Sequence, residues 1–139
     1  FNLHIFGTGP EEDYLKFLVV KNSSKNIFFH GLKKRKEVLN ALSNSDCFIQ
    51  ISQYEGMSFS VLEALSFNKP MILSDLEANI ETAKSAAIYV NPYSINNLKN
   101  AIRLLKCPLI RKTISNNSQK ISTEFYDKNK SLELYYNEL

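Results

Sequence analysis

The sequence is poor in cysteine, glycine and proline, and it has no long apolar run. Its 139 residues include two cysteines, four glycines and four prolines. Cys47 and Cys107 lie in no CxxC motif and have no histidine-rich neighbours, so neither a zinc site nor a disulfide framework is indicated. With 44% hydrophobic and 22% charged residues, the composition excludes collagen-like, disordered and coiled-coil chains. No stretch reaches the roughly 18 apolar residues that span a bilayer.

Charge is nearly balanced along the chain. Seventeen Lys and Arg residues stand against fourteen Asp and Glu residues, which gives a formal net charge of +3. The one dense basic run, Lys33–Lys36, has no interleaved aromatic residues, so we interpret it as a solvated helix start and expect no nucleic acid as a partner. The low use of cysteine favours a reducing, cytoplasmic setting.

The first residues of the chain have the pattern of a strand, over residues 3–6. Residues 1–6 contain neither an initiator Met nor a basic stretch followed by an apolar one, as a signal peptide would. We therefore expect residues 1–139 to be a single domain, of ordinary size for one, that is cut at its N-terminal side from a larger protein.

Short apolar runs alternate with helical patterns. The runs are rich in Ile, Leu, Phe or Val and are bounded by turn-forming residues, which is typical of buried strands; they cover residues 3–6, 27–29, 47–51, 71–73 and 87–90. Amphipathic patterns over residues 11–21, 34–42 and 59–67 predict the helices between them. A further helix is predicted from Ser94, and two more are predicted over residues 109–121 and 128–139. This alternation predicts an α/β fold with a doubly wound parallel sheet of about five strands and a helical C-terminal segment.

Ligands of such sheets bind in the loops that follow the carboxyl ends of the strands. The first of these loops contains Gly7, Gly9 and Pro10. Glycines let a backbone approach a ligand closely, and amides at a helix start favour phosphate. The same stretch is also typical of a tight turn with Pro at the first helical position, and the acidic residues 11–13 would oppose a phosphate. The loop by itself leaves both interpretations open.

The loop after the third strand is more informative because it carries two carboxylates. Glu55 lies in the loop, Glu63 lies just inside the next helix, and the amides of residues 56–60 lie between them. Carboxylates suit the hydroxyls of a sugar or ribose, and helix-start amides suit a diphosphate. Two simpler interpretations remain: Ser60 and Glu63 have the spacing of a capping box, and Glu55 has the character of a solvated loop charge.

The stretch from Glu55 to Leu65 resembles the E-x7-E signature of the retaining glycosyltransferases of family 4, which have the two-domain GT-B architecture. Four other segments, 3–10, 27–32, 46–52 and 68–75, resemble the same family in order and spacing. The resemblance covers nearly all of residues 3–106. It implies a Rossmann-like fold and identifies the chain as the nucleotide-sugar-binding, C-terminal half of a GT-B enzyme.

The resemblance also implies roles for individual residues. Glu63 would accept hydrogen bonds from the ribose hydroxyls, and Glu55 would hold hydroxyls of the donor sugar; these are the two candidate catalytic residues. The remaining candidates would bind the donor through the backbone or apolar side chains: Gly7, Gly9, Gly31, Leu32, Gly56, Met57, Ser58, Phe59 and Ser60.

The reaction that the resemblance implies is transfer of a hexosyl unit from a nucleoside-diphosphate sugar to an acceptor hydroxyl, with the anomeric configuration retained. The family is not thought to need a metal, so we expect neither a metal nor another cofactor. The expected partners are the nucleotide sugar and the N-terminal acceptor domain of the same protein. A peripheral membrane contact, at the inner face of the membrane, would be made through that missing half. Bacterial polysaccharide or glycolipid synthesis is the implied setting.

The chain departs from the family pattern at several points. The family's phosphate-binding Arg and Lys precede the segment that residues 3–10 resemble, so we expect both to lie outside residues 1–139 and expect this fragment alone to be inactive. The family's Gly-Gly-x-Pro-Glu stretch corresponds to residues 77–81 of this chain, of which only the final Glu81 matches. Ser58 stands where the family frequently has Gly. Two alternatives stay open: half of a nucleotide-sugar epimerase, and a non-enzymatic Rossmann-like binding module.

Overall fold

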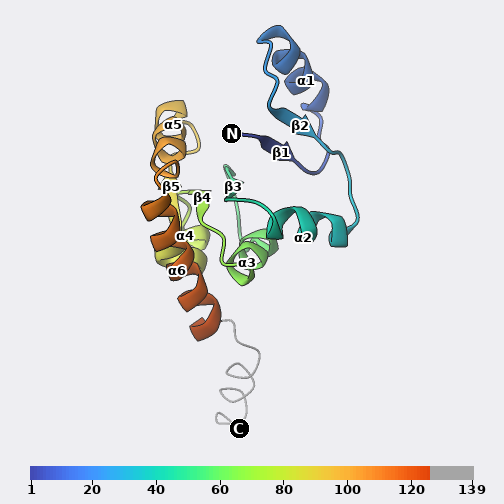
Figure 1. Cartoon of the computed structure of the whole chain (residues 1–139). Helices are drawn as coiled ribbons and strands as arrows, with labels where there is room; N and C mark the ends of the chain where they lie inside the picture. Colours follow the sequence, from blue (N-terminus) through green and yellow to red (C-terminus); the bar gives the residue numbers. More distant parts are fainter. Residues whose placement is uncertain (126–139) are drawn as a thin grey trace. The chain divides into compact units, whose positions relative to one another are not determined.

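Five short parallel strands and their connecting helices make up residues 1–125, the part of the chain that the computed structural model describes (Figure 1). These residues group into two compact units, Phe1–Ala41 and a second unit that begins at Leu42. The expectation that residues 1–139 form one domain stays a prediction, and the helix predicted over residues 128–139 lies outside the described residues.

The first unit is a strand–helix–strand motif. Strands β1 (Leu3–Ile5) and β2 (Ile27–Phe29) pair in parallel, and α1 (Glu12–Lys21) connects them. Helix α2 (Arg35–Ser43) follows and leads into the second unit. Acidic residues in the first turn of α1 and Lys21 in its last turn complement the helix dipole.

The second unit is built around a three-stranded parallel sheet in the order β3-β4-β5. Its strands are β3 (Phe48–Gln50), β4 (Met71–Ser74) and β5 (Ala87–Val90). The connecting elements are α3 (Phe59–Ser66), α4 (Glu77–Ala83), a short 3-10 helix η1 (Lys84–Ala86), α5 (Ile95–Leu104) and α6 (Pro108–Phe125). Pro108 therefore begins a helix, the position where its missing N–H costs nothing.

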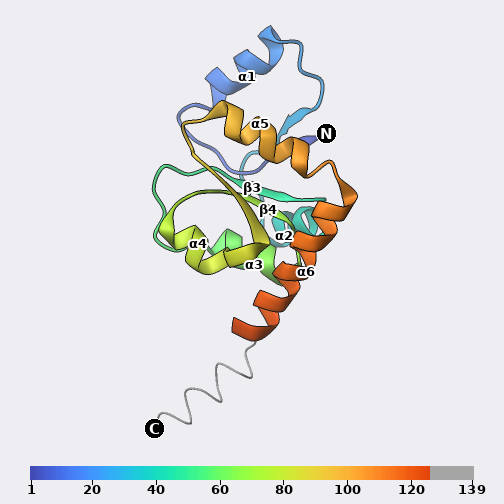
Figure 2. The same cartoon turned by 90° about the vertical axis from the view of Figure 1, so that its left-hand side faces the viewer.

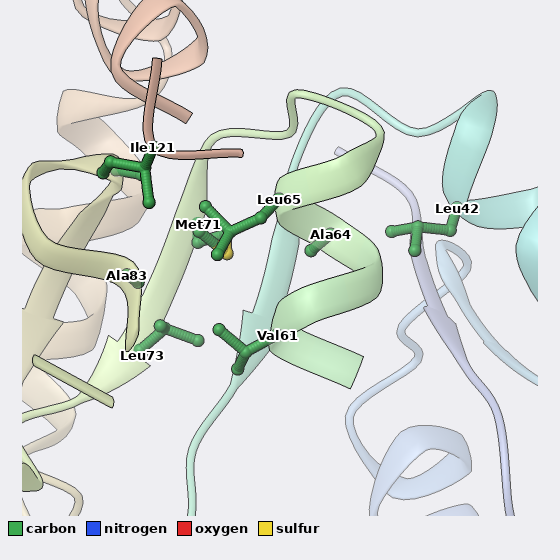
Figure 3. Close-up of a cluster of buried hydrophobic side chains, with 9 residues drawn as sticks. Leu42, Val61, Ala64, Leu65, Met71, Leu73, Ala83 and Ile121 are labelled. Carbon is green, nitrogen blue, oxygen red and sulfur yellow. The ribbon is translucent and has the colours of Figure 1, made fainter. Parts of the chain in front are cut away.

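Alternate residues of β4 face two different hydrophobic clusters. Met71 and Leu73 join one cluster with the buried face of α3, and Figure 3 shows these side chains meeting between helix and strand. Ile72 joins the other cluster, which includes Ala101 of α5. Figure 2 accordingly shows α3 and α4 on one side of the sheet and α5 on the other. Because both faces are covered, every residue of β4 is buried.

The predicted α/β class, the five parallel strands and the covering helices are confirmed. The strands differ from the expectation in their pairing: the hydrogen bonds form one two-stranded and one three-stranded sheet instead of a single sheet of five. Helix α4 was not predicted, because seven residues without a side-chain cap give a weak local signal. Within residues 1–125, no helix has the length and apolarity that a membrane crossing demands.

Candidate functional site

The turn from β3 into α3 is fixed by Ser58. This residue has extended backbone angles, and its Oγ accepts a hydrogen bond from the backbone N–H of Val61 at 3.4 Å, so Ser58 is the N-cap of α3. The capping box predicted for Ser60 and Glu63 is therefore wrong, since Ser60 is already the second residue of the helix.

Hydrogen bonds from other side chains fix the Glu55 carboxylate, so Glu55 is not a fully solvated loop charge. It is half-buried, and its Oε2 accepts a hydrogen bond from Gln50 Nε2 at 2.8 Å and a longer one from Ser52 Oγ at 3.4 Å. Both bonds arrive at one oxygen. No residue within 1–125 donates a hydrogen bond to Oε1, which leaves that oxygen able to accept one from a ligand.

Gln50 connects Glu55 to the cap of α3. The hydroxyl of Ser58 donates to Gln50 Oε1 at 2.9 Å, while the amide nitrogen of Gln50 serves Glu55. Ser58 is itself buried, with 8% of its surface exposed. The last residue of β3 thus ties together the loop carboxylate and the helix start.

A second, more deeply buried set of polar groups supports this loop from β4. Ser74, at the end of β4, accepts a hydrogen bond at its Oγ from the backbone N–H of Ser52 at 2.6 Å. Asn79 Nδ2 donates to the Ser74 carbonyl at 3.0 Å. Both Ser74 and Asn79 are fully buried. The hydrogen bond between Ser52 and Ser74 therefore joins the carboxyl ends of β3 and β4 inside the protein.

Tyr89 of β5 contacts α4 and the residue that caps its C-terminal end. Its hydroxyl donates to the Lys84 carbonyl at 2.7 Å, where Lys84 has a positive φ of 44°. Burial raises the pKa of the Tyr89 phenol to about 12, so this hydroxyl stays protonated and remains a donor at neutral pH.

Glu63 lies on the outward side of α3. The core-facing side chains of this helix are Val61, Ala64 and Leu65, and helical geometry places Glu63 on the opposite side, one turn after Phe59. Glu63 is half-buried, whereas Phe59 is 75% exposed. The two predicted carboxylates therefore flank the start of α3, Glu55 before it and Glu63 within it.

The start of α3 also has unused backbone donors. Among the described residues, none accepts a hydrogen bond from the N–H groups of Phe59 or Ser60. Gly56 and Met57, which precede the cap, are exposed. Such amides carry the partial positive charge of a helix N-terminus and can receive an anion.

The four remaining predicted residues belong to the first unit. Gly7 and Gly31 meet there, with the N–H of Gly7 donating to the Gly31 carbonyl at 2.9 Å, and both have positive φ, 106° and 64°. A side chain at either position would be strained by its backbone angles rather than by lack of space. The Gly9 carbonyl accepts from the N–H of Glu12, and Leu32 is 79% exposed.

His4 and His30 pair with each other in the same unit. His4 Nδ1 and His30 Nε2 lie 2.9 Å apart, and the rings stack in a row with Phe6 and Phe28. This geometry fits satisfied structural histidines. No group of three or more His, Cys, Asp or Glu side chains that could hold a metal occurs within the described part of the chain.

A polar hollow of about 370 Å³ lies at the opposite edge of the β3-β4-β5 sheet. Its lining includes Asp46 and Pro70, which precede β3 and β4, and Arg111 and Lys112 of α6. Lys69, also in the lining, donates to the carbonyls of Ser43 and Ser45. Because ligands of parallel sheets bind at the carboxyl ends of the strands, this hollow is the weaker candidate.

Gln50 and Asn79 are the site residues that the sequence interpretation missed. Gln50 is the one strongly polar residue of the apolar run 47–51, and a polar residue inside such a run signals a buried partner. Asn79 gave no comparable signal, because residues 77–81 were interpreted only as a departure from a glycine-rich loop.

Comparison with known proteins gives a consistent family. The family described as Glycosyl transferases group 1 matches residues 1–121. An uncharacterized glycosyltransferase of Methanocaldococcus jannaschii is 36% identical over 74 residues, 52% of this chain and 18% of the relative. The poly(ribitol-phosphate) alpha-N-acetylglucosaminyltransferase of Staphylococcus aureus is 28% identical over 104 residues, 71% of this chain and 20% of the relative.

Solved structures agree at the level of the fold. The crystal structure of a Staphylococcus aureus TarM mutant in complex with fondaparinux, alpha-GlcNAc-glycerol and UDP matches with a TM-score of 0.82 at 21% identity, over 98% of this chain and 28% of that one. The chain spans about a fifth of the length of the curated relatives it matches.

Proposed function

The chain belongs to the group 1 glycosyl transferases, and we propose that it is the donor-binding, C-terminal half of a retaining enzyme of family 4. In this proposal it binds a nucleoside-diphosphate sugar, whose hexosyl unit passes to an acceptor hydroxyl. The observation that carries the proposal is the half-buried Glu55 carboxylate, held by Gln50 beside the start of α3.

Glu55 takes the sugar end of the donor. Its Oε2 is already occupied by Gln50 and Ser52, and its Oε1 accepts no hydrogen bond from residues 1–125. A carboxylate oxygen fixed in this way is a strong acceptor for sugar hydroxyls, and charge-assisted hydrogen bonds of this kind orient a ligand as well as bind it. Glu55 is an orienting group in this proposal, not a nucleophile.

The diphosphate lies at the start of α3. In this proposal the N–H groups of Phe59 and Ser60 donate hydrogen bonds to the diphosphate. The N–H groups of Gly56, Met57 and Ser58 lie next to the bound sugar and diphosphate. Glu63, on the outward side of the helix, accepts hydrogen bonds from the ribose hydroxyls. These assignments rest on the unused amides of the helix start and on the position of Glu63 opposite the core-facing side.

The first unit, described by itself, carries the remaining predicted donor-binding residues. In this proposal Gly31 and Leu32, which follow β2, contact a nucleotide base, and Gly7 and Gly9 allow a close backbone approach. Gly7 and Gly31 have positive φ values that only glycine adopts without strain, so both positions present bare backbone, as a close approach requires.

The chemistry that follows is electrostatic. As the bond to the diphosphate breaks, negative charge develops on the leaving group, and amides already aimed at it stabilise that charge without reorganisation. The acceptor hydroxyl then attacks the anomeric carbon from the face that the diphosphate leaves, its proton passes to an oxygen of the leaving diphosphate, and retention results. In this proposal the step needs no metal, but it does need the acceptor domain of the same protein. The reaction takes place at the cytoplasmic face of the membrane and belongs to polysaccharide or glycolipid synthesis.

The donor is a UDP-sugar, because the TarM structure holds UDP and the matched Staphylococcus aureus relative transfers N-acetylglucosamine. A thermal-shift panel of UDP-, GDP- and ADP-sugars on the full-length protein tests this. We expect selective stabilisation by a UDP-sugar, unchanged by a chelator. Equal responses to all three classes, or a response that the chelator removes, would contradict the proposal.

The anomeric outcome tests the reaction class. NMR of the transferred product is expected to show the configuration of the donor sugar. An inverted product would refute retention. Interconversion of the UDP-sugar without any acceptor would identify an epimerase instead, and binding without either reaction would identify a binding module.

A further inference from the structure

Gln50 occupies a strand position on a face of the sheet that otherwise carries apolar side chains. Phe48 and Ile49 of β3 pack on opposite clusters, so alternation places Gln50 on the same face as Phe48. Its register partner on β4 is Leu73, which is fully buried in that cluster. An amide placed there loses stability unless both of its ends are hydrogen-bonded.

Both ends of the Gln50 amide are satisfied, and by two different parts of the site. Nε2 donates to Glu55 Oε2 at 2.8 Å, and Oε1 accepts from Ser58 Oγ at 2.9 Å. The polarity of the two partners fixes the orientation of the amide, because a carboxylate only accepts whereas a hydroxyl can donate. A planar amide therefore sets the spacing between the loop carboxylate and the cap of α3.

This arrangement separates the two oxygens of Glu55. Oε2 receives the Gln50 and Ser52 bonds, so rotation of the carboxylate would break both. Oε1 is then held in one direction, away from the bonds that fix its neighbour. Gln50 thus orients Oε1, the oxygen that would bind a sugar hydroxyl, although its own hydrogen bond is to Oε2.

We propose that Gln50 is a positioning residue: its amide fixes the Glu55 carboxylate relative to the capped start of α3, so that one rigid edge meets both the sugar and the diphosphate of a nucleotide sugar. This inference rests on the proposed function and goes beyond it by naming the residue that orients the acidic group. Gln50 itself needs no contact with the donor.

The test compares the affinities of the full-length protein for UDP-sugar and for UDP. Gln50→Met keeps the length of the side chain and removes both hydrogen bonds. We expect its affinity for the UDP-sugar to fall about tenfold, as loss of a charge-assisted bond predicts, while its affinity for UDP stays within about twofold. Gln53→Met is the matched control, since Gln53 is an exposed glutamine of the same loop with no hydrogen bond to a described residue.

A double-mutant cycle separates positioning from a general loss of structure. If Gln50 acts through Glu55, Gln50→Met has no further effect on sugar affinity in a Glu55→Ala background. Equal loss of affinity for UDP and UDP-sugar, or an effect that persists without Glu55, overturns the proposal. Gln50→Asn, which is too short to reach both partners, provides the same comparison where Gln50→Met does not fold.

The cycle also distinguishes two kinds of failure. If Glu55→Ala itself leaves UDP-sugar affinity unchanged, the proposed function fails at its central residue. If Glu55→Ala weakens sugar binding while Gln50→Met and Gln50→Asn do not, only the positioning role fails.

Discussion

The side-chain amide of Gln50 donates a hydrogen bond to the Glu55 carboxylate across 2.8 Å, and this bond joins the last residue of β3 to the loop that follows it. The same amide accepts a bond from Ser58, so the loop is braced at both ends. The side chains of Tyr54 and Met57, which lie on either side of Glu55 in the sequence, are exposed. A ligand at this loop would therefore meet a rigid polar frame with exposed apolar side chains around it.

The two carboxylates are expected to differ in what they recognise. Glu63→Ala removes a partner of the ribose, which is present in both UDP and UDP-sugar, so both affinities should fall by about tenfold. Glu55→Ala removes a partner of the sugar only and should leave UDP affinity unchanged. Calorimetric titration of both ligands into both variants measures this, and an identical pattern for the two variants would show that the roles are misassigned.

Ser74→Ala should destabilise the fold. Its Oγ is fully buried and accepts from the Ser52 backbone N–H, and the alanine variant leaves that N–H without its partner. We expect the free energy of unfolding to fall by about 1–3 kcal/mol, measured by urea denaturation. Ser85→Ala, at an exposed serine, is the control with an expected change below about 0.5 kcal/mol. Equal losses in the two variants would count against the buried link between β3 and β4.

Tyr89 makes stability depend on alkaline pH. Because burial raises its pKa from 10 to about 12, the folded chain keeps a proton that the unfolded chain loses. The contribution is therefore complete below pH 10 and is lost as the pH rises towards 12. Urea denaturation at rising pH should show a steeper alkaline loss for the native chain than for Tyr89→Phe, and parallel curves would contradict a buried phenol.

The two thiols should react at different rates. Hydrogen bonds from the backbone amides of Ile110 and Leu109 lower the pKa of the exposed Cys107 thiol. Burial, with a smaller contribution from Asp46, raises the pKa of Cys47. Iodoacetamide at neutral pH should therefore alkylate Cys107 first, since the thiolate is the reactive form. Mass spectrometry of a time course measures the order, and faster modification of Cys47 would contradict it.

The strands were predictable from sequence because each is a short apolar run bounded by turn residues. Their pairing was not, since the division between β1-β2 and β3-β4-β5 depends on hydrogen bonds between residues far apart in the chain. Helix α4 was missed because its seven residues follow Leu76, an N-cap residue whose side chain cannot cap the helix.

The placement of Glu55 and Glu63 around the start of α3 was predictable from the apolar run 47–51 and the helical pattern 59–67, but the supporting contacts were not. That this turn binds the donor stays a prediction. The capping box expected at Ser60 was wrong because Ser58 caps α3, and Ser58 also contacts Gln50, eight residues away. Such a side-chain contact depends on how the loop folds back on the strand, which local spacing does not specify.

The rate of sugar transfer by the full-length protein carrying both Glu55→Ala and Glu63→Ala, beside a Gln53→Ala control, is the most direct test of the claim that the donor is held at the β3–α3 turn. We expect a rate at least about a hundredfold below that of the native protein, because misplacing the reacting groups by about 1 Å already costs that much. The control should keep the native rate. A doubly substituted protein that is folded and transfers sugar within about twofold of the native rate would contradict the account.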